Sequence, residues 1–260
     1  MTTPQPTNMW LNRPQASSPA TLRLFCFPYA GGGASLYRSW AEPLASVAEI
    51  WSVQLAGREN RLREPLYRSL PALIEALIDG LRDELTPPFA FFGHSLGALI
   101  AFELARALRR EGRELPLQLF VSGHLAPQVP QRHPPIHALP YAQFVQELRR
   151  YRGTPEAVLA NRELLELLVP VLRADFALFE TYVYQPAEPL DCPISAFGGL
   201  SDVEVSQEDL AAWRRQTTGL FTFTLLPGNH FFIQSAQAQL LSALGLDLSR
   251  HVGAARTTAA

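Results

Sequence analysis

The chain alternates short, almost continuous apolar runs with longer stretches in which apolar residues recur every three or four positions. The short runs are typical of strands buried on both faces of a sheet, and the longer stretches are typical of amphipathic helices. Strands are predicted at 22–27, 49–55, 89–92, 117–122, 193–197 and 221–226. Helices are predicted at 36–44, 70–85, 98–108 and 234–244. This order predicts an α/β fold, with a mostly parallel sheet covered by helices on both faces.

The alternation stops between residues 125 and 189, where the pattern predicts no strand. Helices are expected there at 141–151, 154–168 and 171–184, and Thr154 with Pro155 is a typical start for the second of them. We therefore predict a core of residues 21–124 and 190–247 that is interrupted by a helical insertion at 125–189. Residues 1–20 and 248–260 are mostly small or polar and are expected to be flexible.

Composition limits the classes of partner. The 260 residues are 47% hydrophobic, which is enough for a full core, and the formal net charge is −2. This charge gives no overall attraction to nucleic acid or to an anionic membrane. No stretch has the pattern of a signal peptide or a membrane span, and Cys26 and Cys192 lie in or beside apolar runs. We therefore expect a cytoplasmic protein without disulfides and without a nucleic-acid or membrane partner.

The sequence Gly93-His94-Ser95-Leu96-Gly97 stands between a predicted strand and a predicted helix. This is the context of a nucleophile elbow, in which the two glycines permit a very tight turn and the serine is exposed at its tip. Ser95 is therefore the predicted nucleophile.

A serine hydroxyl needs a neighbouring base, and that base needs an acid to orient it. In this type of fold the acid and then the histidine follow the serine along the chain. His230 follows the last predicted strand, and Asp202 follows the strand at 193–197. Asp191 precedes that strand and Asp209 is expected to begin a helix. We therefore predict that Asp202 and His230 complete a catalytic triad.

The negative oxygen of an acyl-transfer intermediate needs two backbone N–H donors. Leu96, directly after the serine, and Ala30, in a loop after an early strand, are the candidates. The neighbouring run Gly31–Gly33 could instead cradle a phosphate. However, it has neither the spaced glycines of a dinucleotide site nor a following Lys-Ser/Thr pair. We therefore interpret this loop as part of an oxyanion hole.

Other charged residues have less specific patterns. Asp175, in the insertion, is interpreted as a structural residue or as a contact of a lid. Two local basic clusters comprise Arg58, Arg61 and Arg63, and Arg149, Arg150 and Arg152. Such clusters are mostly solvated faces, and docking of an acidic partner is the alternative for either.

Five segments together are similar to one known family. They are Phe27-Pro28-Tyr29-Ala30-Gly31-Gly32, Gly57-Arg58-Glu59 followed by Arg61, Gly93-His94-Ser95-Leu96-Gly97-Ala98, Leu172-Arg173-Ala174-Asp175, and Gly228-Asn229-His230-Phe231-Phe232. The chain resembles, from residue 22 to residue 244, the type II thioesterases, stand-alone α/β-hydrolases that accompany polyketide synthases and nonribosomal peptide synthetases. Ala56 is a departure, because the family usually has proline before the Gly-Arg-Glu turn.

The resemblance implies an α/β-hydrolase fold whose helical insertion is a lid over an acyl channel. It implies a substrate as well: an acyl or aminoacyl thioester on the phosphopantetheine arm of an acyl or peptidyl carrier protein, from which misloaded or stalled groups are removed. No metal or cofactor of the enzyme's own is expected, and nothing predicts an obligate oligomer, so a monomer is expected. The candidate substrate-binding residues in the lid are Phe144, Leu148, Phe176, Phe179 and Tyr182.

Three other functions share parts of this pattern. A carboxylesterase acting on small oxygen esters would have the same triad and fold. A dedicated product-releasing or acyl-shuttling thioesterase would differ only in the fate of its acyl-enzyme. A carrier-protein binding module without catalysis is the non-enzymatic alternative, and the presence of Ser95, Asp202 and His230 argues against it.

Overall fold

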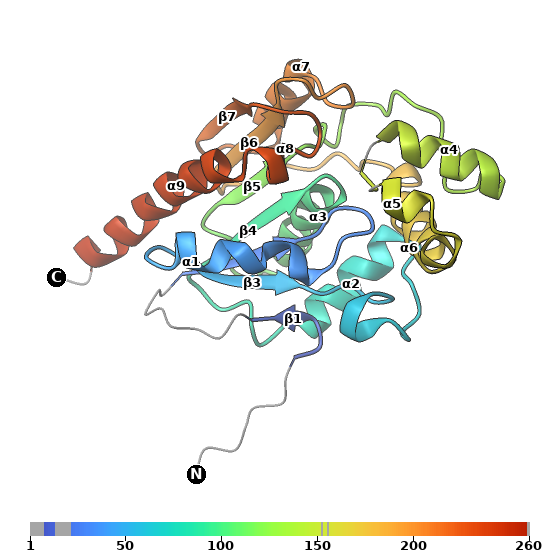
Figure 1. The fold of residues 1–260 in the computed structure, drawn as a ribbon. Coiled ribbons are helices and arrows are strands. Elements are labelled where there is room, and N and C mark those ends of the chain that lie inside the picture. Colours follow the sequence, from blue (N-terminus) through green and yellow to red (C-terminus); the bar gives the residue numbers. More distant parts are fainter. Residues whose placement is uncertain (1–7, 14–21, 152, 155, 259–260) are drawn as a thin grey trace, which may run out of the picture.

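The computed structural model describes residues 8–13, 22–151, 153–154 and 156–258 (Figure 1). Its described residues form a seven-stranded sheet in the order β1-β3-β2-β4-β5-β6-β7, in which only β1 is antiparallel to its neighbour. The strands are β1 (Leu11–Asn12), β2 (Arg23–Phe27), β3 (Glu49–Val53), β4 (Phe89–His94), β5 (Leu119–Ser122), β6 (Ile194–Gly199) and β7 (Phe221–Leu226). The predicted mostly parallel sheet is confirmed.

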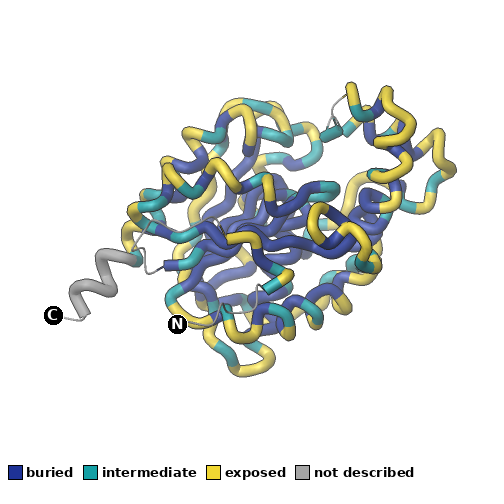
Figure 2. Tube along the Cα trace, turned by 60° about the horizontal axis from the view of Figure 1, so that its bottom comes forward, coloured by how far each residue is buried: buried dark blue, intermediate teal, exposed yellow. Residues whose placement is uncertain are grey.

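Helices cover both faces of this sheet because successive strand residues point to opposite sides. In β2, Phe25 and Phe27 belong to one apolar cluster, and Leu24 and Cys26 belong to the other. The first cluster packs under α2 (Leu70–Gly80), α3 (Leu96–Arg110), α7 (Gln207–Ala211) and η3 (Ala212–Gln216). The second packs under η1 (Ala34–Trp40), α1 (Ala41–Leu44), α8 (Phe232–Ser235) and α9 (Gln237–Thr258). The strands β2 to β6 are buried between these layers (Figure 2), whereas the edge strand β7 is largely exposed along its length.

The order in which the chain adds strands to the sheet changes direction between β2 and β4. β2 pairs with β3 on one side and with β4 on the other, so the chain connections from these two neighbouring strands diverge. A crevice forms at such a point, outside the carboxyl ends of the strands, and it is the usual ligand site of α/β sheets. The loop after β2 and the turn after β4 both lie at this position.

The insertion between β5 and β6 contains α4 (Tyr141–Tyr151), α5 (Glu156–Leu159) and α6 (Arg162–Glu180). These helices lie together at one end of the molecule (Figure 1) and share an apolar cluster of their own. The buried members of that cluster are Ile136, Phe144, Val145, Leu148, Leu159, Leu165, Val169, Leu172 and Phe176. The insertion is therefore a small packed layer of its own. We call it the lid.

The lid helices differ from the predicted ones. The prediction divided residues 154–184 into two helices on either side of Pro170, whereas α6 continues through that proline. Proline removes one backbone donor from the helix, but Val169 and Leu172, on either side of it, both pack in the lid cluster. Packing of one continuous face outweighs the lost hydrogen bond. Pro155, the expected first helical residue, lies outside the described residues.

Both terminal segments are more ordered than predicted. Within the expected flexible segment 1–20, β1 pairs with β3 and buries Leu11, while residues 1–7 and 14–20 lie outside the described part. At the other end α9 extends to Thr258, and Leu248 is fully buried. The expected tail beginning at residue 248 is therefore partly core. No helix in the described part is long and apolar enough to cross a membrane.

The placement of α9 predicts a difference between two leucines of the same helix. Leu248 is 0% exposed and Leu246 is 64% exposed. Leu248→Ala should lower the free energy of unfolding by about 2–5 kcal/mol, because it removes buried methyl groups and leaves a cavity. Leu246→Ala is the matched control and should change it by less than about 0.5 kcal/mol. Urea unfolding measures both, and equal effects would contradict the packing of this segment.

Candidate active site

The turn after β4 holds Ser95 in a strained backbone conformation. Its φ is 53° and its ψ is −122°, a region that non-glycine residues rarely adopt. A Cβ added to Gly93 would lie 2.0 Å from the carbonyl oxygen of Gly97, and one added to Gly97 would lie 2.1 Å from that of Phe27. Glycine is therefore required at both positions. The Ser95 amide donates to the carbonyl of Ser122 on β5 at 2.7 Å, which fixes the turn to the sheet.

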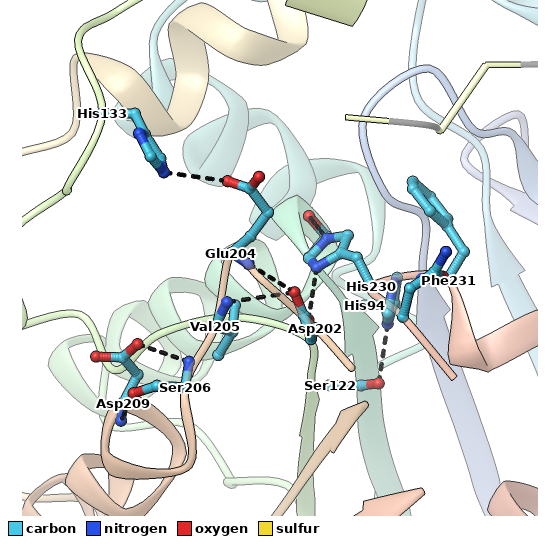
Figure 3. Close-up of polar contacts among 12 residues, drawn as sticks. His94, Ser122, His133, Asp202, Glu204, Val205, Ser206, Asp209, His230 and Phe231 are labelled. Carbon is cyan, nitrogen blue, oxygen red and sulfur yellow. Dashed lines mark hydrogen bonds and ion pairs between the residues drawn. The ribbon is translucent and has the colours of Figure 1, made fainter. Parts of the chain in front are cut away.

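The structure brings together the three predicted triad residues. His230 Nε2 lies 3.1 Å from Ser95 Oγ, and His230 Nδ1 lies 2.9 Å from Asp202 Oδ2. The second contact is drawn in Figure 3. Because a carboxylate only accepts hydrogen bonds, Nδ1 carries the proton and Nε2 presents a lone pair to the serine hydroxyl. The geometry is that of a nucleophile, a base and an orienting acid.

Asp202 is itself held rigidly. Its side chain is 0% exposed, and its second oxygen accepts hydrogen bonds from the backbone of Glu204 (2.9 Å) and Val205 (3.3 Å) (Figure 3). The rejected acid Asp209 instead accepts from the Ser206 amide at 2.8 Å in the capping box of α7. The loop after β6 thus fixes both carboxylates by backbone donors, and only that of Asp202 reaches His230.

The two predicted oxyanion donors border the same cavity as Ser95. Leu96 is the first residue of α3, and Ala30 lies in the loop after β2. Neither backbone N–H makes a hydrogen bond within the described residues. The first amides of a helix have no intrahelical partner and carry partial positive charge, so this edge of the cavity suits a developing negative oxygen.

A buried ion pair holds the loop that carries Ala30. Asp175 on α6 accepts hydrogen bonds from both terminal nitrogens of Arg58, at 2.6 and 2.7 Å, and from the Gly31 amide at 2.7 Å. The two side chains are 1% and 9% exposed, and Arg58 also donates to the Gly32 carbonyl at 3.2 Å. One carboxylate therefore ties the lid to the oxyanion loop.

This pair was missed by the sequence interpretation. It took Asp175 as a structural residue or lid contact, and it placed Arg58 in a surface cluster. One feature of the sequence could have indicated the pair: Arg58 and Asp175, which carry opposite charges, each lie in a segment that carries the family resemblance. Arg61 of the same cluster is also buried, with its guanidinium 3.9 Å from the Trp10 ring centre and a donor at 2.9 Å from the Gln54 carbonyl. Neither buried arginine is available for docking.

The second basic cluster is paired on the lid surface. Arg150 contacts Glu147 at 2.9 Å and Glu204 at 3.0 Å, and Arg149 lies 3.5 Å from Glu156. Arg152 lies outside the described residues. Of the six arginines in the two clusters, Arg63 is the exposed member of the first.

A cavity extends from Ser95 and His230 beneath the lid. Of the five residues predicted to bind substrate, it is lined by Leu148, Phe176 and Phe179. The expectation for Phe144 and Tyr182 is corrected. Phe144 is fully buried behind Phe176 in the lid cluster, and the Tyr182 hydroxyl donates to Glu103 at 2.7 Å on a different face of the molecule.

Other lining residues were not predicted. They include Tyr29 and Phe231 from the loops after β2 and β7, His124 and Leu125 from the segment directly after β5, and Tyr151, Leu172 and Glu180 from the lid helices. Three of these, Tyr29, Leu172 and Phe231, stand in the quoted segments, so the motifs themselves held a usable signal. Among the described residues no group of His, Cys, Asp and Glu side chains could hold a metal ion.

Two buried histidines accompany the site. His94, inside the elbow, contacts Ser122 Oγ at 2.9 Å and its ring centre lies 5.3 Å from that of His230. Burial, with a contribution from His230, lowers the pKa of His94 well below 6.5. Burial also lowers the pKa of His124 to about 4. Both imidazoles are therefore neutral near pH 7.

The sequence and the fold are similar to those of known thioesterases. The thioesterase domain model matches residues 22–247. The gramicidin S biosynthesis protein GrsT of Aneurinibacillus migulanus is 45% identical over 234 residues, which cover 90% of this chain and 91% of GrsT. The type II thioesterase BorB from the borrelidin biosynthetic cluster superposes with a TM-score of 0.84 at 35% identity, covering 92% of this chain and 97% of BorB. ClbQ from the colibactin NRPS/PKS pathway has a TM-score of 0.84 at 32% identity, covering 89% and 98%.

The buried histidines predict acid sensitivity of the fold. Below pH 6.5 these two histidines bind protons in the unfolded chain but remain neutral in the folded chain. The free energy of unfolding therefore decreases as the pH is lowered, by up to about 1.4 kcal/mol per pH unit for each histidine. Above pH 6.5 this contribution is constant. Urea unfolding between pH 7 and pH 5 measures the slope. His124→Gln removes one titrating group and should flatten it, and an unchanged slope would contradict this assignment.

Substitutions in the Arg58–Asp175 pair should affect stability and activity separately. Asp175→Leu alone leaves a buried, unpaired guanidinium and should destabilise the fold by about 3–5 kcal/mol. The double variant Arg58→Met with Asp175→Leu removes both charges and should remain folded. Its Gly31 amide has lost the acceptor that held the oxyanion loop, so kcat on a p-nitrophenyl ester should fall about 100-fold.

Thermal unfolding and kinetics on the same preparations test this. A folded double variant with unchanged kcat would show that the pair fastens the lid without positioning the oxyanion loop.

Proposed function

The chain belongs to the thioesterase family, and from this premise we propose that it hydrolyses acyl or aminoacyl thioesters on the phosphopantetheine arm of a carrier protein. Its relatives include type II thioesterases from the borrelidin biosynthetic cluster and from the yersiniabactin NRPS/PKS pathway. The observation that carries the proposal is the continuous contact from Asp202 through His230 to Ser95, with Ser95 and His230 in the lining of a mostly apolar cavity. The substrate class rests on the relatives.

In the first half of the reaction Ser95 is acylated. Its Oγ attacks the thioester carbonyl while His230 Nε2 takes the hydroxyl proton, and Asp202 stabilises the imidazolium that forms. The carbonyl oxygen becomes negative and is met by the amides of Ala30 and Leu96. The C–S bond then breaks, and the pantetheine sulfur leaves as a thiol with the proton that His230 returns. A thiolate is a good leaving group, so little acid assistance is needed.

In the second half water releases the acid. His230 takes a proton from a water molecule, whose oxygen attacks the acyl carbonyl on Ser95. The same two amides stabilise the second intermediate, and its collapse returns the proton to Ser95 Oγ. Protons and charges balance within the triad, so the proposed reaction needs no metal or cofactor.

The proposed role is editing, in which misloaded or stalled groups are removed and the carrier is restored. The lid side of the cavity supports this, because Leu148, Phe176 and Phe179 offer a mostly apolar wall that does not depend on one acyl shape. The partner is an acyl or peptidyl carrier protein, whose arm delivers the thioester to Ser95.

Ser95→Ala tests the nucleophile. The alanine variant should lose at least about 10⁴-fold in release of the acyl group from a loaded carrier, because no oxygen remains to form the acyl-enzyme. Mass spectrometry of the carrier measures the release, and thermal unfolding checks that the fold is kept. Ser242→Ala, on the exposed surface of α9, is the matched control and should retain full activity.

Release that persists in the folded Ser95→Ala variant would contradict the assignment. A second comparison tests the substrate class. The wild-type protein should hydrolyse a carrier-bound thioester with higher kcat/KM than the free ethyl ester of the same acid. The reverse preference would indicate a small-molecule carboxylesterase.

A further inference from the structure

His124 occupies a position in the cavity that the proposed reaction does not use. It follows β5, two residues after Ser122, whose carbonyl accepts the Ser95 amide at 2.7 Å. The residue is 8% exposed and lines the cavity together with Ser95 and His230. The charge of His230 is one of the causes that lower the pKa of His124, so the two rings lie within electrostatic reach. His124 therefore borders the reacting end of the cavity.

The hydrogen bonds of His124 fix its tautomer. Nδ1 lies 2.6 Å from the Leu125 carbonyl oxygen, which only accepts, so Nδ1 carries the proton. The carbonyl of His124 itself accepts from Trp213 Nε1 at 2.8 Å, which anchors the backbone. The imidazole is therefore a neutral ring in a fixed orientation, and its Nε2 is a hydrogen-bond acceptor.

Nε2 has no hydrogen-bond partner among the described residues. It is also not sealed by protein, because the buried unpaired side-chain atoms of the described residues are Trp51 Nε1, His94 Nε2 and Arg113 Nη1. The open space beside this otherwise buried side chain is the cavity. An acceptor with a free lone pair thus faces the volume that the acyl group would fill.

The carboxylates that line the same cavity are already engaged. Glu180 accepts from the amides of Ile136 and His137, each at 2.9 Å. Glu204 is paired with Arg150 at 3.0 Å. The same cavity is also lined by apolar residues, among them Leu125, Leu148 and Phe176. A bound group with no donor would therefore remove water from Nε2 without replacing its hydrogen bond, which is unfavourable.

We propose, on the basis of the proposed thioesterase function, that His124 determines acyl specificity by accepting at Nε2 a hydrogen bond from an N–H or O–H group of the acyl chain. Amino- or hydroxy-substituted acyl groups are hydrolysed in preference to unsubstituted groups of the same length, because only they satisfy this acceptor. The protein thereby clears aminoacyl or hydroxyacyl groups from carriers more efficiently than simple alkyl acyl groups.

The test uses one carrier loaded with butyryl, 3-hydroxybutyryl or 2-aminobutyryl groups, which share a four-carbon chain. The wild-type protein should hydrolyse at least one substituted group with a higher kcat/KM than butyryl, and the two substituted substrates distinguish a hydroxyl from an amine donor. His124→Phe keeps a planar ring of similar size but lacks the acceptor. It should lower the preference over butyryl about tenfold, and kcat/KM for butyryl itself should rise, because the acceptor that butyryl leaves without a hydrogen bond is gone.

Two variants act as controls. His124→Gln restores an acceptor through its carbonyl oxygen and should recover part of the preference. Leu148→Met changes the cavity wall with little change of volume and should affect all three substrates alike.

Three results would overturn the proposal. Equal kcat/KM of the wild-type protein on all three substrates, with turnover intact, would contradict the role of His124 and leave the proposed function standing. Equal losses on all three substrates in His124→Phe would show a structural role instead. Failure of the wild-type protein to hydrolyse any of the three would contradict the proposed function and, with it, this inference.

Discussion

The close approach of the β4 turn to the end of β2 is the constraint that positions every other part of the site. The backbone at Gly97 lies so near the Phe27 carbonyl that no side chain fits between them. This contact starts α3 at the switch point of the sheet, beside the loop that carries Ala30. It also forces Ser95 into an unfavourable φ, a strain that the surrounding sheet must hold. This one packing contact thus positions the nucleophile and the Leu96 amide beside the loop that carries Ala30.

The lid is joined to this centre through charge as well as apolar packing. Asp175 belongs to α6, yet its hydrogen bonds go to Arg58 and to Gly31 of the oxyanion loop. A buried carboxylate with these partners has little freedom to move. Displacement of α6 therefore also disturbs the loop that supplies one oxyanion donor. The lid helix α6, which lines the cavity, and the loop that carries Ala30 are therefore coupled through Asp175.

The sequence predicted what is locally encoded. Buried strands and the elbow have short-range patterns, and chain order together with a position directly after a predicted strand selected Asp202 and His230. It missed the Arg58–Asp175 pair, because an arginine and an aspartate 117 residues apart each look like ordinary surface charges until the fold joins them. The last helix was underestimated because small polar residues surround Leu248, although its spacing of four from Leu244 continues the buried face. Tyr182 was misplaced because it lies beyond the end of α6.

Acyl transfer through Ser95, activated by His230, is the step from which the other functional conclusions derive. Reaction with a fluorophosphonate probe, followed by peptide mass spectrometry and assay of a loaded carrier, tests this step. We expect a single adduct on Ser95, with loss of thioester hydrolysis in proportion to labelling. An adduct at another residue, or full hydrolysis by protein whose Ser95 is completely modified, would contradict it.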